Sequence, residues 1–495
     1  MIAPGGEVLL PDCLDVAART WRDRLALTWN DQRWTFGELA GSVAGAAARL
    51  APLTGGGYRL GLLAANRPGF VFATHAARVL GVPFVPLNWR QTAEEIAWQL
   101  AAAEIGVLLV DESRWEVAQG AARDLPLTIV PMAELERAAP SLPFAAPAIP
   151  AARELAVLFT SGTTNRPKGV RLSYGNVWFS AVASALHLGH HRDDAWLAML
   201  PMFHVGGLSI LFRSALGGVP VYLHEQFDPE RALAAIDGGA TLVSAVPTVL
   251  TRLIETRGDT PWPPSLRCVL LGGAAAPAGL VTESLRRGIP VAPTYGLTET
   301  ASQATTLLPD EVPSRPGSSG LPLPMTRLRV TTPDGLAAPD EPGAIEVSGP
   351  TLFLGYLGEE ARGDEWFATG DIGVLDGDGY ITVLDRRDDL IVSGGENISP
   401  AEIERVLLGH PNVRDAGVIA ALDDLWGARP AAAVVWAGEP AAAAATLTAF
   451  CRERLAGFKI PVRIDVVDAL PRTASGKLLR RELRRQFECR DTECE

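Results

Sequence analysis

Short apolar runs alternate with longer, helix-like segments through residues 1–310 of the chain. Each run is the length of a buried strand and too short for a typical helix. The clearest runs lie at 60–63, 107–110, 155–159, 219–223, 241–245 and 269–271. Between them, Thr35 and Glu38 have the spacing of a capping box, which predicts a helix start. Because strands alternate with helices, we expect mostly parallel sheets covered by helices.

The pattern changes after residue 310. Pro, Gly and Asp turns separate short β runs such as 328–330 and 344–347, which predicts a small β-barrel or a distorted sheet at about 311–384. Residues 388–495 form an α+β region, in which Ser399 and Glu402 predict another capping box. We therefore expect an α/β protein with a large N-terminal domain at 1–387 and a small C-terminal domain at 388–495.

Composition excludes several classes of partner. The net charge of −13 argues against a surface for nucleic acid or anionic membranes. No apolar stretch is long enough to span a bilayer, so we predict no membrane insertion. The five cysteines are scattered and odd in number, which fits a reduced cytoplasm better than a disulfide framework.

A polar loop at 160–169 follows the apolar run at 155–159 directly. It contains Gly, Ser and Thr residues with one lysine, Lys168, so it offers backbone N–H groups, hydroxyls and a cation to an anion. Phosphate is the expected ligand. The loop is not a Walker A motif, because Pro167 stands where that motif requires its second Gly.

Lysine is scarce in this chain. Of 44 basic residues only Lys168, Lys459 and Lys477 are lysines, and the others are arginines. The lysine ammonium is a compact point charge, whereas the arginine guanidinium is planar and forked. We therefore expect each lysine to mark a position where a guanidinium group could not replace the ammonium group. Lys477 closes a second Gly/Ser loop at 471–477. The sequence therefore predicts two phosphate-handling lysines in separate loops.

Both loops resemble motifs of the AMP-forming acyl-CoA synthetases, the adenylating superfamily. The resemblance implies a carboxylate substrate, ATP, Mg²⁺ and CoA, and a small C-terminal domain that is mobile about a hinge at Asp388. It implies ATP contacts from Thr160, Ser161, Gly162, Thr163, Thr164, Lys168, Gly272, Gly273, Tyr295, Gly296, Asp371 and Arg386. Catalysis would rest on Lys477, Thr298 and Glu299, and Glu299 would hold Mg²⁺, a cation that prefers oxygen ligands.

Two glycines and one histidine complete the implied site. Gly394 and Gly395 would leave room for the pantetheine arm of CoA. His204, in the segment 201–207, resembles the family's residue at the entrance of the acyl site. In the family, the acid first attacks the α-phosphate of ATP to give acyl-AMP and pyrophosphate, and CoA then takes the acyl group.

The histidines His187, His190 and His191 lack a metal-binding spacing, so we expect a surface loop there.

The acid itself is the least determined part of the site. Adenylation domains that use amino acids have an acidic residue at the entrance of the acyl pocket, where it binds the ammonium group. In this chain His204 and Val205 occupy that entrance. The segment 208–216 has one apolar helical stripe, and Arg213 lies outside it. Such an arginine could bind a second carboxylate, or it could lie on the surface. Ser302 is a second candidate anchor.

Three segments favour one branch of the family. Residues 201–213, 298–303 and 384–391 resemble the o-succinylbenzoate–CoA ligases of menaquinone synthesis, whose substrate is an aromatic dicarboxylate. Another aryl- or fatty acyl-CoA ligase is the alternative. A non-catalytic adenylate-binding protein is a remote third, which would be expected to lack Glu299 or Lys477. The partners expected are small molecules, with a homodimer as one option for assembly.

Overall fold

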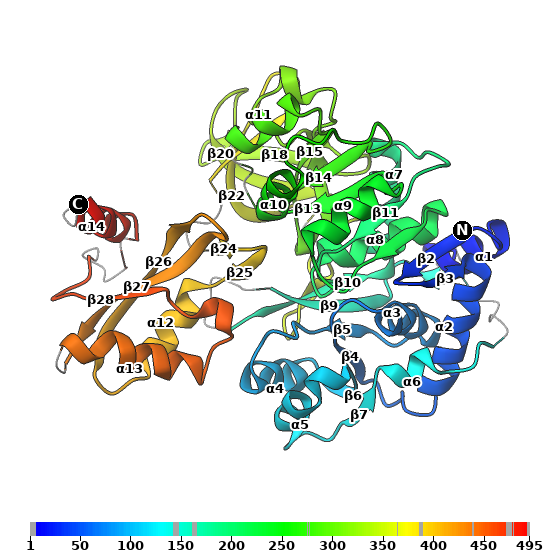
Figure 1. The fold of residues 1–495 in the computed structure, drawn as a ribbon, viewed down its shortest axis with the longest axis horizontal. Helices are drawn as coiled ribbons and strands as arrows, with labels where there is room; N and C mark the ends of the chain where they lie inside the picture. The colour runs from blue at the N-terminus through cyan, green and yellow to red at the C-terminus, as the bar shows by residue number, and fades with distance from the viewer. Residues whose placement is uncertain are drawn as a thin grey trace. The chain divides into compact units, whose positions relative to one another are not determined.

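The computed structural model describes residues 6–141, 148–160, 166–274, 276, 278–363, 365–385, 390–437, 440–471, 478 and 480–492. The chain forms two units (Figure 1). The first contains residues 1–89, 96–159 and 169–385, and the second contains 90–95, 160–168 and 386–495. The predicted hinge at Asp388 lies outside the described residues.

The first unit contains a seven-stranded sheet. Its order is β21-β10-β9-β5-β4-β6-β7. The strands are β4 (Arg59–Leu63), β5 (Phe84–Pro86), β6 (Ile105–Val110), β7 (Thr128–Pro131), β9 (Glu154–Thr160), β10 (Lys168–Ser173) and β21 (Gly355–Tyr356). The neighbouring strands from β9 to β7 in this order are parallel, whereas β10 and β21 pair antiparallel with each other.

The first unit also contains a nine-stranded sheet, in the order β17-β16-β15-β14-β13-β11-β12-β2-β3. Its strands are β2 (Leu25–Trp29), β3 (Gln32–Thr35), β11 (Trp196–Ala198), β12 (Val221–Leu223), β13 (Leu242–Ala245), β14 (Cys268–Leu271), β15 (Val291–Leu297), β16 (Ser302–Thr306) and β17 (Leu321–Pro322). The strands from β2 to β15 are parallel, and antiparallel pairs close both edges. The expected helix-covered parallel sheets are confirmed.

Helices cover these sheets (Figure 1). They are α1 (Cys13–Thr20), α2 (Phe36–Leu50), α3 (Pro68–Leu80), α4 (Ala93–Ala102), α5 (Trp115–Ala122), α6 (Ala133–Glu136), α7 (Tyr174–Leu188), α8 (Val205–Gly217), α9 (Pro229–Asp237), α10 (Pro247–Arg257) and α11 (Ala278–Arg286). The predicted capping box begins α2, where Thr35 and Glu38 each accept the other's backbone N–H.

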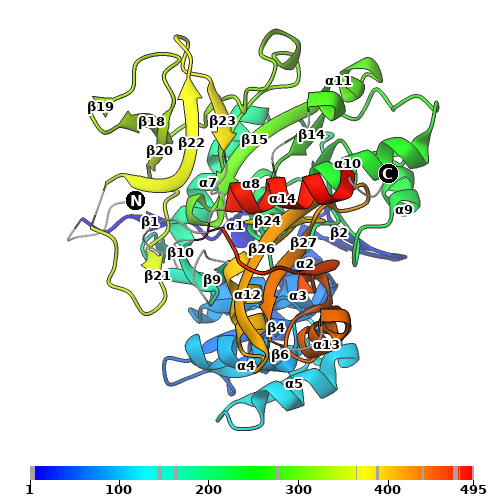
Figure 2. The same cartoon turned by 90° about the vertical axis from the view of Figure 1, so that its left-hand side faces the viewer.

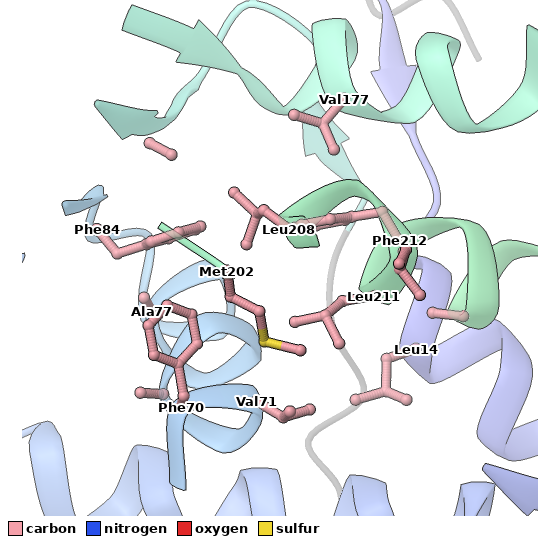
Figure 3. Close-up of a cluster of buried hydrophobic side chains, with 14 of the residues drawn as sticks. Leu14, Phe70, Val71, Ala77, Phe84, Val177, Met202, Leu208, Leu211 and Phe212 are labelled. Atoms are coloured by element: carbon pink, nitrogen blue, oxygen red, sulfur yellow. The ribbon is translucent and has the colours of Figure 1, made fainter. Parts of the chain in front are cut away.

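The main core lies between the two sheets. Figure 3 shows side chains of α1, α3, β5, α7 and α8 packed together in it. The stripe predicted on α8 is part of this cluster: Leu208, Leu211, Phe212 and Ala215 are all buried. On the nine-stranded sheet, alternate strand residues face this cluster and a second one formed with α9, α10 and α11. Strand alternation therefore explains how one sheet serves two cores.

The β region after residue 310 is a five-stranded antiparallel sheet, in the order β19-β18-β20-β22-β23. Its strands are β18 (Arg327–Thr332), β19 (Gly335–Leu336), β20 (Gly343–Ser348), β22 (Phe367–Leu375) and β23 (Ile381–Asp385). Two more short strands, β1 (Leu9–Leu10) and β8 (Ile149–Pro150), pair with each other. None of the helices in the described ranges combines the length and apolar character needed to cross a bilayer.

The second unit is built on a three-stranded sheet. Its elements are β24 (Ile391–Ser393), β25 (Glu396–Ile398), α12 (Pro400–Leu408), β26 (Val413–Asp423), β27 (Gly427–Trp436), α13 (Pro440–Arg452), β28 (Arg463–Val466) and α14 (Arg480–Thr492). Val418 and Val434 pack toward α12 and α13, whereas Ile419 and Ala433 pack toward α14. Figure 2 shows α14 lying across β26 and β27. Alternation again gives each face of the sheet its own core.

Lys459 is buried in the second unit, and its ammonium group lies between two carboxylates. Nζ is 2.5 Å from Oε1 of Glu95 and 2.9 Å from Oε1 of Glu402. The predicted capping box at Ser399 is therefore wrong. The Ser399 hydroxyl has no hydrogen-bond partner, and the Glu402 carboxylate binds the buried ammonium instead. A point charge fits between two carboxylates, which explains why this position is a lysine.

Replacing Lys459 with Met should lower the local free energy of unfolding of the second unit by about 3 kcal/mol, because two buried carboxylates lose their cation. Burial lowers the pKa of Lys459, but Glu402 and Glu95 outweigh it and the net pKa is raised from 10.5. The stabilisation is therefore complete below pH 10.5 and is lost only as the pH rises through the raised value.

Hydrogen exchange of peptides covering α12 can measure this difference. The deficit of the variant should be constant between pH 7 and pH 9. Glu94→Gln serves as the control, because Glu94 is exposed on the same helix as Glu95 and should change stability by no more than about 0.5 kcal/mol. If α12 of the Met variant is as protected from exchange as in the wild type, the ion pairs of Lys459 with Glu95 and Glu402 contribute nothing to stability.

Candidate active site

Two residues predicted for the nucleotide meet in the structure. Tyr295 lies on β15 and Asp371 on β22, and the Tyr295 hydroxyl donates a hydrogen bond of 2.7 Å to Oδ2 of Asp371. Both residues are buried. The backbone N–H of Asp371 also donates to Oγ1 of Thr369, at 3.1 Å. A buried carboxylate fixed in this way suits two adjacent hydroxyl donors such as those of a ribose.

The glycines at this end of the sheet are required by close backbone approach. A Cβ atom on Gly272 would lie 2.6 Å from Cγ2 of Thr294, and one on Gly296 would lie 1.8 Å from the carbonyl oxygen of Ser302. Gly273 has a positive φ of +79°. Glycine at these three positions is therefore explained by the backbone of the sheet itself, through close approach or positive φ. Their contacts to a nucleotide stay predictions.

Glu299 belongs to a 3-10 turn, η2 (Thr298–Thr300), that follows β15. Its Oε1 accepts a hydrogen bond of 2.9 Å from the hydroxyl of Tyr356, and its backbone oxygen accepts one of 2.9 Å from the N–H of Phe353. Among the residues that the structure describes, no lysine or arginine forms an ion pair with it. The Glu299 carboxylate, next to the hydroxyl residue Thr298, offers the oxygen ligands that Mg²⁺ prefers.

The phosphate loop begins at the end of β9 and ends at the start of β10. Thr160 Oγ1 donates to the backbone oxygen of Lys168 at 3.4 Å, which joins the two ends of the loop. The predicted contacts Ser161, Gly162, Thr163 and Thr164 lie outside the described residues. The same is true of Arg386 and Lys477.

His204 is the N-cap residue of α8, and its ring centroid lies 4.6 Å from that of Phe203. Nine residues later on the same helix is Arg213. The expected surface loop of histidines is only partly right. His190 and His191 are exposed, but His187 lies in the last turn of α7, with Nε2 2.8 Å from the backbone oxygen of Thr306.

Arg213 is buried, so a surface position for it is wrong. Only 5% of the residue is exposed, and its Nη2 donates a hydrogen bond of 3.1 Å to Oγ of Ser302. The guanidinium also lies 5.6 Å from the ring centroid of Trp196, and its Nε has no hydrogen-bond partner. Burial lowers the pKa of Arg213 to about 10, so the side chain remains a cation at neutral pH. The structure thus brings the two predicted acid-binding residues together.

Ser302 has an unusual backbone. Its φ is +115°, and the preceding Ala301 has a φ of +53°. Both are rare conformations for residues other than Gly, and such strain is concentrated at functional sites. A shift in register between β15 and β16 accompanies it. The strained backbone holds the Ser302 hydroxyl against Arg213.

Gly394 and Gly395 form the two-residue turn between β24 and β25, with φ values of +55° and +88°. A Cβ atom on Gly394 would lie 2.4 Å from the Trp426 ring. Two consecutive residues with positive φ are typical of a tight hairpin turn. Glycine is therefore needed for the turn itself, and the contact with CoA stays a prediction.

Two residues of the site were missed by reasoning from the sequence, namely Tyr356 and Trp196. Tyr356 contacts Glu299, and Trp196 lies against Arg213. Each partner lies far along the chain, so spacing gives no signal of either contact.

Comparison with known proteins shows the family of this chain. Residues 14–357 match the model of the AMP-binding enzyme family, and residues 402–477 match that of the AMP-binding enzyme C-terminal domain. A 2-succinylbenzoate–CoA ligase of Geobacillus kaustophilus is 43% identical over 484 residues, which cover 96% of this chain and 98% of that protein.

Two solved structures of the o-succinylbenzoate CoA synthetase of Bacillus subtilis are 40% identical to this chain and match 96% of it. One is a double mutant bound to a product analogue, OSB-NCoA, with 98% of that chain covered and a TM-score of 0.90. The other is a complex with ATP and magnesium, with 100% of that chain covered and a TM-score of 0.72. This chain belongs to the AMP-binding enzyme family.

Proposed function

We propose that this protein is an ATP-dependent acid–CoA ligase that converts 2-succinylbenzoate to 2-succinylbenzoyl-CoA in menaquinone biosynthesis. The acid is first activated as acyl-AMP with release of pyrophosphate, and CoA then displaces AMP. The relatives named above have this substrate in their names, and one was solved with ATP and magnesium.

The choice of acid rests on one observation: Arg213 is buried and forms no ion pair with a described carboxylate. Three arginines are buried in the described part of the chain: Arg78, Arg213 and Arg257. Arg78 is paired with Asp12 and Arg257 with Asp237, but no described carboxylate lies within ion-pair distance of Arg213. A buried cation without a carboxylate is costly unless a ligand supplies one. A dicarboxylic acid brings one carboxylate for activation and a second for Arg213.

The remaining side chains have separate roles. Asp371, fixed by Tyr295, would hold the ribose hydroxyls, and the phosphate loop between Thr160 and Lys168 would hold the phosphates. When bound, Mg²⁺ supplies positive charge to the phosphate oxygens, and Glu299 would hold it. Because the acid and the α-phosphate are both anions, positioning and positive charge are what this reaction needs from the protein.

A panel of acids tests the proposal. Pyrophosphate release and thioester mass should be measured with 2-succinylbenzoate, with 4-oxo-4-phenylbutanoate and 2-butanoylbenzoate, which each lack one carboxylate, and with fatty acids. We expect 2-succinylbenzoate to have the highest kcat/KM. A fatty acid or a monocarboxylic aryl acid as the best substrate would favour the alternative, another aryl- or fatty acyl-CoA ligase.

Location and assembly are part of the same proposal. The described cysteines Cys13, Cys268 and Cys451 are all free and buried, which is compatible with the reduced cytoplasm. Burial raises the pKa of the Cys268 thiol to about 12, so it stays protonated. A homodimer stays a prediction that light scattering can test.

A further inference from the structure

The segment 353–357 joins two parts of the nucleotide site. Its strand β21 pairs with β10, the strand that begins at Lys168, with Tyr356 opposite Val170. Leu357 N–H donates to the Gly169 oxygen at 2.7 Å. On its other side, the segment reaches η2 through the two hydrogen bonds that Tyr356 and Phe353 make with Glu299. The phosphate-loop strand and Glu299 are thus connected through a single short strand.

The segment and the residues just before it are firmly held. Nδ2 of Asn176 donates to the backbone oxygens of Pro350 and Leu352, at 2.9 and 2.7 Å. The Phe353 ring packs edge-on against Tyr356, with 4.9 Å between the ring centroids. Packing and backbone bonds therefore fix where the Tyr356 hydroxyl lies. A donor fixed in this way restricts the rotamers of the carboxylate that it binds.

We propose that Tyr356 is a positioning residue for the Mg²⁺-binding carboxylate of Glu299. A phenol donates one hydrogen bond without placing a positive charge beside the Glu299 carboxylate. An arginine or lysine in its place would neutralise the carboxylate. Partners of this kind commonly affect metal affinity by about ten- to hundred-fold. The inference rests on the ATP-dependent part of the proposed function and does not depend on which acid is used.

Tyr356→Phe tests it, because the ring and its packing remain and only the hydroxyl is lost. Binding of α,β-methylene-ATP, which cannot transfer AMP to an acid because a methylene group replaces its α,β-bridging oxygen, should be measured by calorimetry with Mg²⁺ and again with EDTA. We expect about ten-fold weaker binding with Mg²⁺ and unchanged binding with EDTA. In a Glu299→Gln background the same change should have no further effect, since the carboxylate that it orients is gone.

Tyr380→Phe is the matched control. Its hydroxyl donates to Oε1 of Glu311 at 2.7 Å, the same kind of pair in a place that has no predicted nucleotide contact. It should leave both binding constants unchanged. Equal weakening of Tyr356→Phe with Mg²⁺ and with EDTA would make Tyr356 a merely structural residue. Unchanged binding, or an effect that persists with Glu299→Gln, would also overturn the proposal. Because no acid is present, these results are independent of the acid panel.

Discussion

Replacing Lys477 with Ala is expected to reduce adenylation about a thousand-fold while thioester formation from supplied acyl-AMP continues at nearly the wild-type rate. The physical reason is charge. The attacking acid and the α-phosphate are both anions, so the transition state gathers negative charge that a positioned cation stabilises. Loss of one such group commonly costs about a hundred- to a thousand-fold in kcat. The second half-reaction starts from acyl-AMP and has no pyrophosphate to stabilise.

The choice of residue rests on the sequence, because Lys477 lies outside the described residues. It is one of only three lysines in the chain, and it closes the Ser475–Gly476 loop. Lys459, buried between Glu95 and Glu402, gives an example of a lysine retained where a point charge is needed. We therefore expect Lys477→Arg to be nearly as poor as Lys477→Ala in adenylation.

The two half-reactions should be measured separately. Pyrophosphate release reports the first, and CoA consumption with synthetic 2-succinylbenzoyl-AMP reports the second. Equal losses in both for Lys477→Ala would contradict a role limited to adenylation. Full activity of Lys477→Arg would contradict the argument from lysine scarcity.

Much of the fold could be predicted from local pattern. The apolar runs became strands of two parallel-rich sheets, because buried parallel strands read as continuous apolar stretches. Tyr295 and Asp371 were both expected at the nucleotide, and their hydrogen bond joins two strands that are distant in sequence. The family motifs around Tyr295 and Asp371 predicted that both residues belong to the nucleotide site. No rule based on sequence spacing could have predicted that the two side chains form a hydrogen bond.

The errors came from contacts between distant segments. Ser399 and Glu402 have the spacing of a capping box, but spacing does not reveal Lys459, whose buried charge competes for the Glu402 carboxylate. Likewise, a single arginine on a mostly apolar helix is compatible with a surface position and with a carboxylate-binding site. Only the packing of α8 between the sheets shows that Arg213 is buried.

Replacing Arg213 with Leu is expected to lower kcat/KM for 2-succinylbenzoate by about a hundred-fold or more. Truncating one partner of a buried, hydrogen-bonded charge pair costs about 2–5 kcal/mol, because the other charge is left buried and unpaired. At about 1.4 kcal/mol per decade, 3 kcal/mol corresponds to roughly a hundred-fold. The KM for ATP should hardly change, since the predicted nucleotide contacts lie elsewhere.

Two control variants separate charge recognition from damage to the helix. Ser209→Ala removes a buried hydroxyl from the same helix, one that donates to the backbone oxygen of Gly206, and should leave the choice of acid unchanged. Ser302→Ala removes the partner of Arg213 and should weaken 2-succinylbenzoate by about ten-fold or less, because the cation itself remains.

The most direct measurement is the ratio of kcat/KM for 2-succinylbenzoate to that for whichever single-carboxylate analogue the wild-type enzyme activates. It should be determined in the wild type and in Arg213→Leu under the same conditions. If Arg213 binds the carboxylate that is not activated, the ratio falls by about a hundred-fold in the variant, because the analogue has no second charge to satisfy. An unchanged ratio would contradict the account and leave Arg213 as a structural residue of α8.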